Sequence, residues 1–241
     1  MRALGEPTPT LAVAVAQPLT VLGDLDANVH EHVAAIEDAG ARLVVFPEMS
    51  LMGYDMAAPI VHPEDPRLAP LVAACDRTDA VALVGAPVGT PAADFIGVLV
   101  VWRGGVAEVY RKMYLGSAES VRFTAGQKPA VVEVDGWRIG LAVCKDTGVP
   151  AHAAATAESG MDVYAAGVLE HADDAHVQPE RARRVTREHG VWAAIASFAG
   201  STGGGFTEAC GGSAIFDPEG AAVATAGVSP GETIRHLLTK P

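Results

Sequence analysis

Short apolar runs alternate along the chain with segments in which apolar residues recur every three or four positions. Leu11–Gln17 and Leu43–Phe46 are almost continuously apolar, which is typical of strands buried on both faces. Between them, Asp26–Ala39 shows helical periodicity, with an acidic residue suited to capping its start and Gly40 at its end. This part of the chain therefore predicts a strand, a helix and a second strand.

The same alternation continues toward the C-terminus. The further predicted strands are Val81–Pro87, Phe95–Trp102, Val106–Arg111, Ala130–Val134, Trp137–Val143, Asp162–Val168, Val191–Phe198, Ser213–Asp217 and Ala221–Ala226. The further predicted helices are Pro66–Arg77, Pro150–Ser159 and Pro179–His189. Helices that alternate with strands, some of them paired in hairpins, predict an α/β fold with mixed sheets. Because no break in composition divides residues 1–241, we expect a single domain.

Composition excludes several classes of protein. The 241 residues are 49% hydrophobic and 19% charged, which argues against intrinsic disorder. A formal net charge of −12 disfavours binding to nucleic acid and to anionic membrane surfaces. No apolar run approaches the roughly 18 residues of a membrane-spanning helix. The N-terminal residues lack the apolar core of a secretion signal and three cysteines are too few for a disulfide framework, so we expect a cytoplasmic protein.

Three chemically reactive side chains stand at the ends of predicted buried strands. They are Glu48, Lys112 and Cys144. Ligands of open α/β sheets bind outside the strand ends, so these three groups can converge there. For any one of them, the start of a polar loop is a sufficient explanation. Together they provide the thiol, the carboxylate and the ammonium group that nucleophilic catalysis can use.

The chemistry needs all three residue types. A free thiol has a pKa of about 8.5, so only a few per cent is thiolate at neutral pH and a base must take its proton. Glu48 can act as that base if burial raises its pKa toward about 6–7. Attack by Cys144 on a carbonyl or nitrile carbon creates negative charge, which Lys112 and the backbone N–H of Lys145 can stabilise.

The motifs around these residues resemble those of the nitrilase, or carbon–nitrogen hydrolase, superfamily. The matching segments are Asn28-Val29 with Ala41 to Glu48 and Gly53-Tyr54, Tyr110-Arg111-Lys112 with Leu115, Gly140 to Cys144 with Asp146 and Pro150, Gly211-Gly212-Ser213, and Asp217-Pro218-Glu219-Gly220. The resemblance covers nearly the whole chain.

This resemblance implies an α-β-β-α sandwich of two mixed sheets with helices on the outer faces, commonly assembled as a homodimer through its helical faces. It implies Glu48 as general base, Lys112 as oxyanion stabiliser and Cys144 as nucleophile, with no metal and no cofactor. Glu119 falls where many members carry a second glutamate that positions the substrate; its alternative interpretation is a solvated loop carboxylate. Lys145 replaces the usual aromatic residue after the cysteine, and either a substrate contact or a structural salt bridge explains it.

The reaction expected from the resemblance is hydrolysis of a small linear amide to a carboxylic acid and ammonia through a cysteine thioester. Hydrolysis of an N-carbamoyl compound or of a nitrile remains open as an alternative. So does a different class of protein, a catalytically silent ligand-binding or scaffold protein with the same fold. The intact set of Glu48, Lys112 and Cys144 favours an enzyme, because binding alone does not require it.

The remaining candidates have simpler explanations. Cys75 is predicted to be a buried structural thiol on a helix. Cys210, in a glycine-rich loop, is predicted to be a bystander, with a second reactive thiol as the alternative. The cluster from His171 to His176 lacks a metal-ligand spacing and is predicted to be a solvated acidic loop. A papain-like pair of Cys144 with His152 leaves the glutamate and the lysine unexplained.

Overall fold

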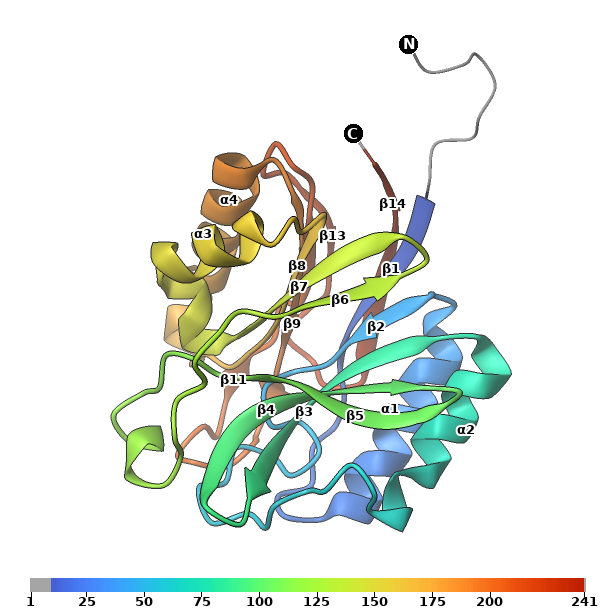
Figure 1. The fold of residues 1–241 in the computed structure, drawn as a ribbon, viewed down its shortest axis with the longest axis vertical. Coiled ribbons are helices and arrows are strands. Elements are labelled where there is room, and N and C mark those ends of the chain that lie inside the picture. The colour runs from blue at the N-terminus through green and yellow to red at the C-terminus, as the bar shows by residue number, and fades with distance from the viewer. Residues whose placement is uncertain (1–9, 241) are drawn as a thin grey trace.

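The structure, a computed structural model, describes residues 10–240, and its main elements are two six-stranded sheets (Figure 1). In spatial order the first sheet contains β14 (Glu232–Thr239), β1 (Thr10–Gln17), β2 (Leu43–Val45), β3 (Val81–Thr90), β4 (Ala93–Trp102) and β5 (Gly105–Arg111). The second contains β13 (Ala222–Thr225), β12 (Ala214–Phe216), β9 (Trp192–Ser197), β8 (Val163–Val168), β7 (Trp137–Val143) and β6 (Val131–Val134). The short strands β10 (Ala199–Gly200) and β11 (Ala209–Cys210) pair separately.

Helices cover the outer face of each sheet. Figure 1 shows α1 (Leu25–Ala39) and α2 (Ala69–Thr78) beside the first sheet, and α3 (Pro150–Glu158) and α4 (Val177–His189) beside the second. The 3₁₀ turns are η1 (Pro66–Leu68), η2 (Glu119–Val121), η3 (Cys144–Gly148) and η4 (Ala172–Asp174). The predicted α-β-β-α sandwich is confirmed.

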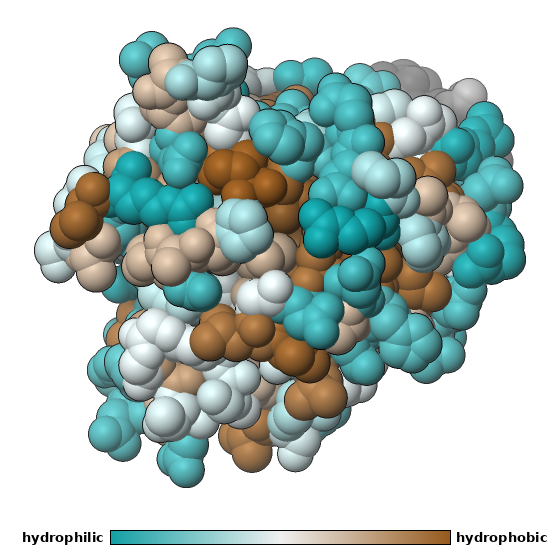
Figure 2. All heavy atoms as spheres, turned by 90° about the horizontal axis from the view of Figure 1, so that it is seen from below, coloured by the Kyte–Doolittle hydropathy of each residue, from teal (hydrophilic) through white to brown (hydrophobic). Residues whose placement is uncertain are grey.

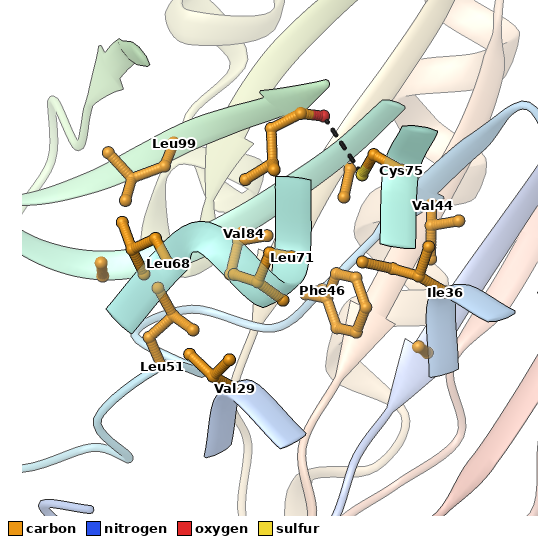
Figure 3. Packing of buried hydrophobic residues seen from close by; sticks show 14 of the residues in the cluster. Val29, Ile36, Val44, Phe46, Leu51, Leu68, Leu71, Cys75, Val84 and Leu99 are labelled. Atoms are coloured by element: carbon orange, nitrogen blue, oxygen red, sulfur yellow. Dashed lines mark hydrogen bonds between the residues drawn. The ribbon is translucent and has the colours of Figure 1, made fainter. Parts of the chain in front are cut away.

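Three buried layers of apolar side chains hold the four structural layers together. One layer lies between α1, α2 and the first sheet, where Ile36, Phe46 and Leu71 are at most 2% exposed (Figure 3). The second lies between the two sheets and contains Trp137. The third packs α3 and α4 onto the second sheet. Fully burying a large apolar side chain stabilises the fold by about 1.5–3 kcal/mol, so these layers dominate its stability.

Both sheets are mixed, as the sequence predicts. In the first, β1, β2 and β3 run parallel, and in the second β7, β8 and β9 run parallel; the outer strands are antiparallel. The hairpin between β6 and β7 turns at Asp135 and Gly136, which both have positive φ, as expected for this dipeptide. The parallel strands β2 and β7 end next to the residues that form the candidate site.

The predicted helices and strands are present. The short strands β10 and β11 lie in what the sequence predicts to be a glycine-rich loop, and two longer elements also differ. The predicted helix Pro66–Arg77 is divided into η1 and α2. Strand β14 is absent from the sequence-based prediction, although it pairs with the whole of β1 at the edge of the first sheet. Its residues are mostly partly exposed and only Leu238 is buried, so its apolar pattern is too weak to identify it.

The outer surface is mixed in character. Seen from below, hydrophobic side chains interrupt a surface that is otherwise hydrophilic or neutral (Figure 2). Large exposed hydrophobic residues in the whole molecule include Leu19, Leu22, Val121, Val228 and Leu237. Across residues 10–240, no helix combines the length and the apolar character that crossing a membrane requires.

Candidate active site

Glu48 lies in a turn held tightly between the two sheets. Strand β2 ends at Val45, and the turn that follows packs against Gly85 of β3 and Gly167 of β8. A Cβ atom on Gly85 would lie 2.2 Å from the carbonyl oxygen of Pro47, and one on Gly167 would lie 2.7 Å from the backbone nitrogen of Glu48. Only glycine permits this approach, so these two positions fix where Glu48 stands. Nothing in the sequence pattern distinguishes either glycine from the others in the chain.

Lys112 connects two carboxylates. It follows β5, and its side chain is buried although it is charged. Its Nζ donates to Oε1 of Glu48 at 2.6 Å and to Oε1 of Glu119 at 2.7 Å. Charged groups are almost never buried unless they are paired, and Lys112 has two partners. The structure therefore brings together the base and lysine candidates that the sequence places far apart.

Glu119 is an integral part of this cluster. It begins the turn η2 and is 2% exposed, which rules out the solvated loop carboxylate considered above. Besides Lys112, it accepts a hydrogen bond from the hydroxyl of Tyr54 at 2.6 Å and from the backbone N–H of Gly116 at 2.6 Å. Tyr54 is a site residue to which the sequence analysis assigned no role, because nothing in its local pattern indicates a partner 65 residues away.

Cys144 occupies a strained turn at the end of β7. It is half-buried, and its φ of +42° lies in the left-handed region that non-glycine residues rarely adopt. Such a conformation costs of the order of 1–3 kcal/mol and is held only where the surroundings enforce it. The thiol donates to the carbonyl oxygen of Leu169 at 3.5 Å, and Thr147 Oγ1 donates to the carbonyl oxygen of Cys144 at 2.6 Å.

The charges of the cluster shift the pKa values of all its members. Burial, assisted by the charge of Glu119 and opposed by Lys112, raises the pKa of Glu48 to about 7. Burial disfavours the charged form of Lys112, but attraction to Glu48 and Glu119 outweighs it and raises the pKa of the ammonium. Burial raises the pKa of the Cys144 thiol, and the nearby charge of Glu48 raises it further. Near neutral pH the site therefore holds a protonated thiol, a carboxyl group that can gain or lose a proton, and the Lys112 cation.

One oxygen of Glu48 is available for proton transfer. Within residues 10–240, Oε2 of Glu48 is buried and has no hydrogen-bond partner, whereas Oε1 binds Lys112. A buried polar atom without a partner is unfavourable and calls for an explanation, and a catalytic role is one such explanation. Glu48 is thus oriented by one oxygen and can accept a proton with the other.

Lys145 does not form the salt bridge considered from the sequence. Its Nζ donates to the carbonyl oxygen of Leu115 at 2.7 Å, and among the described residues no carboxylate lies within ion-pair distance of it. The side chain therefore fastens the nucleophile turn to the loop that connects Lys112 with Glu119.

The other two cysteines are buried and lie outside the charged cluster. Cys75 is buried in the outer apolar layer and donates to the carbonyl oxygen of Val101 (Figure 3). Cys210 is buried and lies 3.6 Å from the hydroxyl of Ser197. Neither contacts Lys112 or Glu48 in the described part of the chain.

The histidine candidates also have other roles. His152 binds Tyr110 and Tyr164 through its two ring nitrogens and does not pair with the nucleophile candidate. Residues 171–176 are exposed, in agreement with a solvated loop. Residues 10–240 contain no group of three or more metal-ligating side chains arranged to hold an ion.

Comparisons with known proteins identify proteins of similar sequence and similar fold. An (R)-stereoselective amidase from a Pseudomonas species is 27% identical over 224 residues, which cover 90% of this chain and 80% of that protein. The structure of Nit3 from Saccharomyces cerevisiae, a member of branch 10 of the nitrilase superfamily, has a TM-score of 0.85 at 21% identity and covers 95% of this chain and 90% of Nit3.

A second similar structure is an amidase from Nesterenkonia sp. AN1, a cysteine-to-alanine mutant in complex with butyramide. It has a TM-score of 0.82 at 23% identity and covers 95% of this chain and 91% of that one. The carbon–nitrogen hydrolase family profile matches residues 12–237, nearly the entire chain. The chain therefore belongs to the carbon–nitrogen hydrolase family.

Proposed function

We propose that this chain, acting as one catalytic domain, hydrolyses small linear amides to a carboxylic acid and ammonia. The observation that carries the proposal is the buried Glu48–Lys112–Glu119 cluster beside a strained cysteine. A protein that only binds ligands does not need a lysine buried between two carboxylates, since desolvating these charges costs several kcal/mol per ion.

In the first half-reaction, Oε2 of Glu48 accepts the proton of Cys144 and the sulfur attacks the amide carbonyl carbon. The new S–C bond moves the carbonyl electron pair onto oxygen. The Lys112 ammonium and the backbone N–H of Lys145 stabilise this oxyanion. When the tetrahedral intermediate collapses, the C–N bond breaks, Glu48 returns the proton to nitrogen, and ammonia leaves a thioester on Cys144.

In the second half-reaction, Glu48 removes a proton from water, and the resulting hydroxide adds to the thioester carbonyl. Collapse breaks the C–S bond and releases the carboxylic acid, while Cys144 regains its proton from Glu48. Glu119 keeps Lys112 in place and, with Lys145, borders the region that the substrate enters. Both half-reactions use side chains of the site and water.

The choice of a small linear amide is supported by the relatives. The Pseudomonas protein is named an amidase, and the Nesterenkonia amidase was solved with butyramide. Small amides such as butyramide are therefore the first substrates to test.

The test is ammonia release from a panel of aliphatic amides, N-carbamoyl amino acids and nitriles, with Cys144→Ala, Glu48→Gln and Cys75→Ala measured in parallel. We expect turnover of at least one amide, its loss in the first two variants, and wild-type rates in Cys75→Ala. Undiminished hydrolysis by Cys144→Ala would overturn the mechanism. Turnover confined to carbamoyl compounds or nitriles would overturn the choice of substrate.

A further inference from the structure

Behind the nucleophile lies a second buried polar cluster that the proposed reaction does not use. Its four side chains come from β5, η3, α3 and β8 and are at most 3% exposed; they are Tyr110, Asp146, His152 and Tyr164. The Tyr110 hydroxyl lies 2.7 Å from Oδ2 of Asp146 and 2.8 Å from Nε2 of His152. Nδ1 of His152 lies 3.0 Å from the hydroxyl of Tyr164.

The chemistry of these groups fixes the direction of each hydrogen bond. Asp146 accepts hydrogen bonds from two backbone N–H groups and from the Tyr110 hydroxyl. This is the arrangement expected of an ionised carboxylate, which accepts hydrogen bonds and donates none. Tyr110 therefore donates to Asp146, and its oxygen accepts from Nε2–H of His152. In neutral His152 the other nitrogen then accepts from the hydroxyl of Tyr164. The four groups form one continuous, fully satisfied chain.

This series of hydrogen bonds connects the turn that carries Cys144 with the segment that carries Lys112. Asp146 accepts from the backbone N–H of Val143, directly before the nucleophile candidate, at 3.0 Å. It also accepts from the backbone N–H of Tyr114, two residues after Lys112, at 2.8 Å. Tyr110 itself stands two residues before Lys112. A single carboxylate thus binds the nucleophile turn to the segment that carries the lysine.

We propose that Tyr110 and His152 are positioning residues, which act through Asp146 to hold the left-handed turn of Cys144 in register with Lys112. This inference rests on the proposed function, because its consequence is alignment of the nucleophile with the oxyanion stabiliser. Neither residue touches the reacting atoms. Misplacement of a reacting group by about 1 Å can reduce a rate by about 100-fold, so the loss of one link is measurable.

The test compares Tyr110→Phe, which removes only the linking hydroxyl, with Ile36→Val, a core variant in a different layer. For each protein, kcat and KM for butyramide, the rate of Cys144 alkylation by iodoacetamide, and Tm are measured. We expect Tyr110→Phe to lower kcat and the alkylation rate at least about 10-fold while KM changes less than about twofold. Ile36→Val lowers Tm and leaves kcat and alkylation unchanged.

A pair of histidine variants keeps the proposal testable if Tyr110→Phe folds poorly. His152→Gln retains an N–H donor for Tyr110, whereas His152→Leu does not, so glutamine should restore most of the activity that leucine loses. Wild-type kcat and alkylation in Tyr110→Phe, or equal losses in the two histidine variants, would overturn the positioning role. If the wild type releases no ammonia from any amide, the proposed function fails. The alkylation rates alone then still decide whether the hydrogen bonds of Tyr110 and His152 position the turn.

Discussion

At the scale of single residues, the site depends on how Lys112 is shared. Its ammonium lies 2.6 Å from Glu48 and 2.7 Å from Glu119, yet the two carboxylates respond differently. Burial raises the pKa of Glu48, whereas for Glu119 the charge and hydrogen bond of Lys112 outweigh burial and lower the pKa. Two chemically identical groups thereby acquire different roles, with Glu119 permanently charged and Glu48 ready to exchange a proton near neutral pH.

This difference predicts the pH dependence of the reaction. Glu48 must be ionised to accept the thiol proton, and its pKa is about 7. We therefore expect kcat/KM to fall about tenfold per pH unit below pH 7 and to level off above it, since kcat/KM reports groups of the free enzyme. Rates measured from pH 5 to 9 check this, with far-UV circular dichroism as the control for folding. A profile that stays flat down to pH 5 contradicts Glu48 as the base.

The sequence indicates candidate site residues more clearly than it indicates their surroundings. Glu48, Lys112 and Cys144 could be proposed as candidates because each follows a recognisable strand and has reactive chemistry. Tyr54 could not, because its role depends on a hydrogen bond to Glu119, far away in the sequence. The contact of Lys145 could not be predicted either, since a hydrogen bond to a backbone carbonyl oxygen leaves no pattern in the sequence.

At the scale of elements, the turn after β2 packs closely against β3 and β8 because Gly85 and Gly167 have no side chains there. We expect Gly85→Ala to displace this turn, because the added Cβ would lie 2.2 Å from Pro47 O and 2.4 Å from the backbone nitrogen of Met49. Overpacking of this kind costs about 1–3 kcal/mol. The resulting shift of Glu48 should lower kcat/KM by about 100-fold.

Gly89→Ala is the matched control on the same strand, since a Cβ there would meet only side-chain atoms, at 3.2 Å or more. We expect it to retain most of the activity. Chemical denaturation of both variants separates a local displacement from general loss of stability. Full activity in Gly85→Ala would show that the close packing of the turn does not position Glu48.

Some elements can be predicted from the sequence and others cannot, for physical reasons. Strands buried on both faces, such as β2 and β8, have largely apolar sequences that are easy to identify. Strand β14 lies at a sheet edge and alternates polar with partly buried residues, so its identity is determined by pairing with β1. A side chain that must be absent, as at Gly85, becomes evident only when the opposing backbone is in place.

At the scale of the whole molecule, the four-layer sandwich leaves α3 and α4 on an outer face (Figure 1). The resemblance stated from the sequence implies assembly through such a helical face, and on that ground we propose that the chain forms a dimer in solution. Sedimentation velocity at micromolar concentration, repeated after tenfold dilution, measures this. A single monomeric species at every concentration would contradict the expected assembly.

We propose that Cys144 carries the acyl group during amide hydrolysis. This can be tested by mixing the protein with excess butyramide, stopping the reaction with acid within one turnover, and locating any added mass by peptide mass spectrometry. We expect a butyryl thioester on the peptide that contains Cys144, none on the peptides of Cys75 or Cys210, and none in Cys144→Ala. Butyramide turnover without any adduct, together with continued hydrolysis by Cys144→Ala, would contradict it.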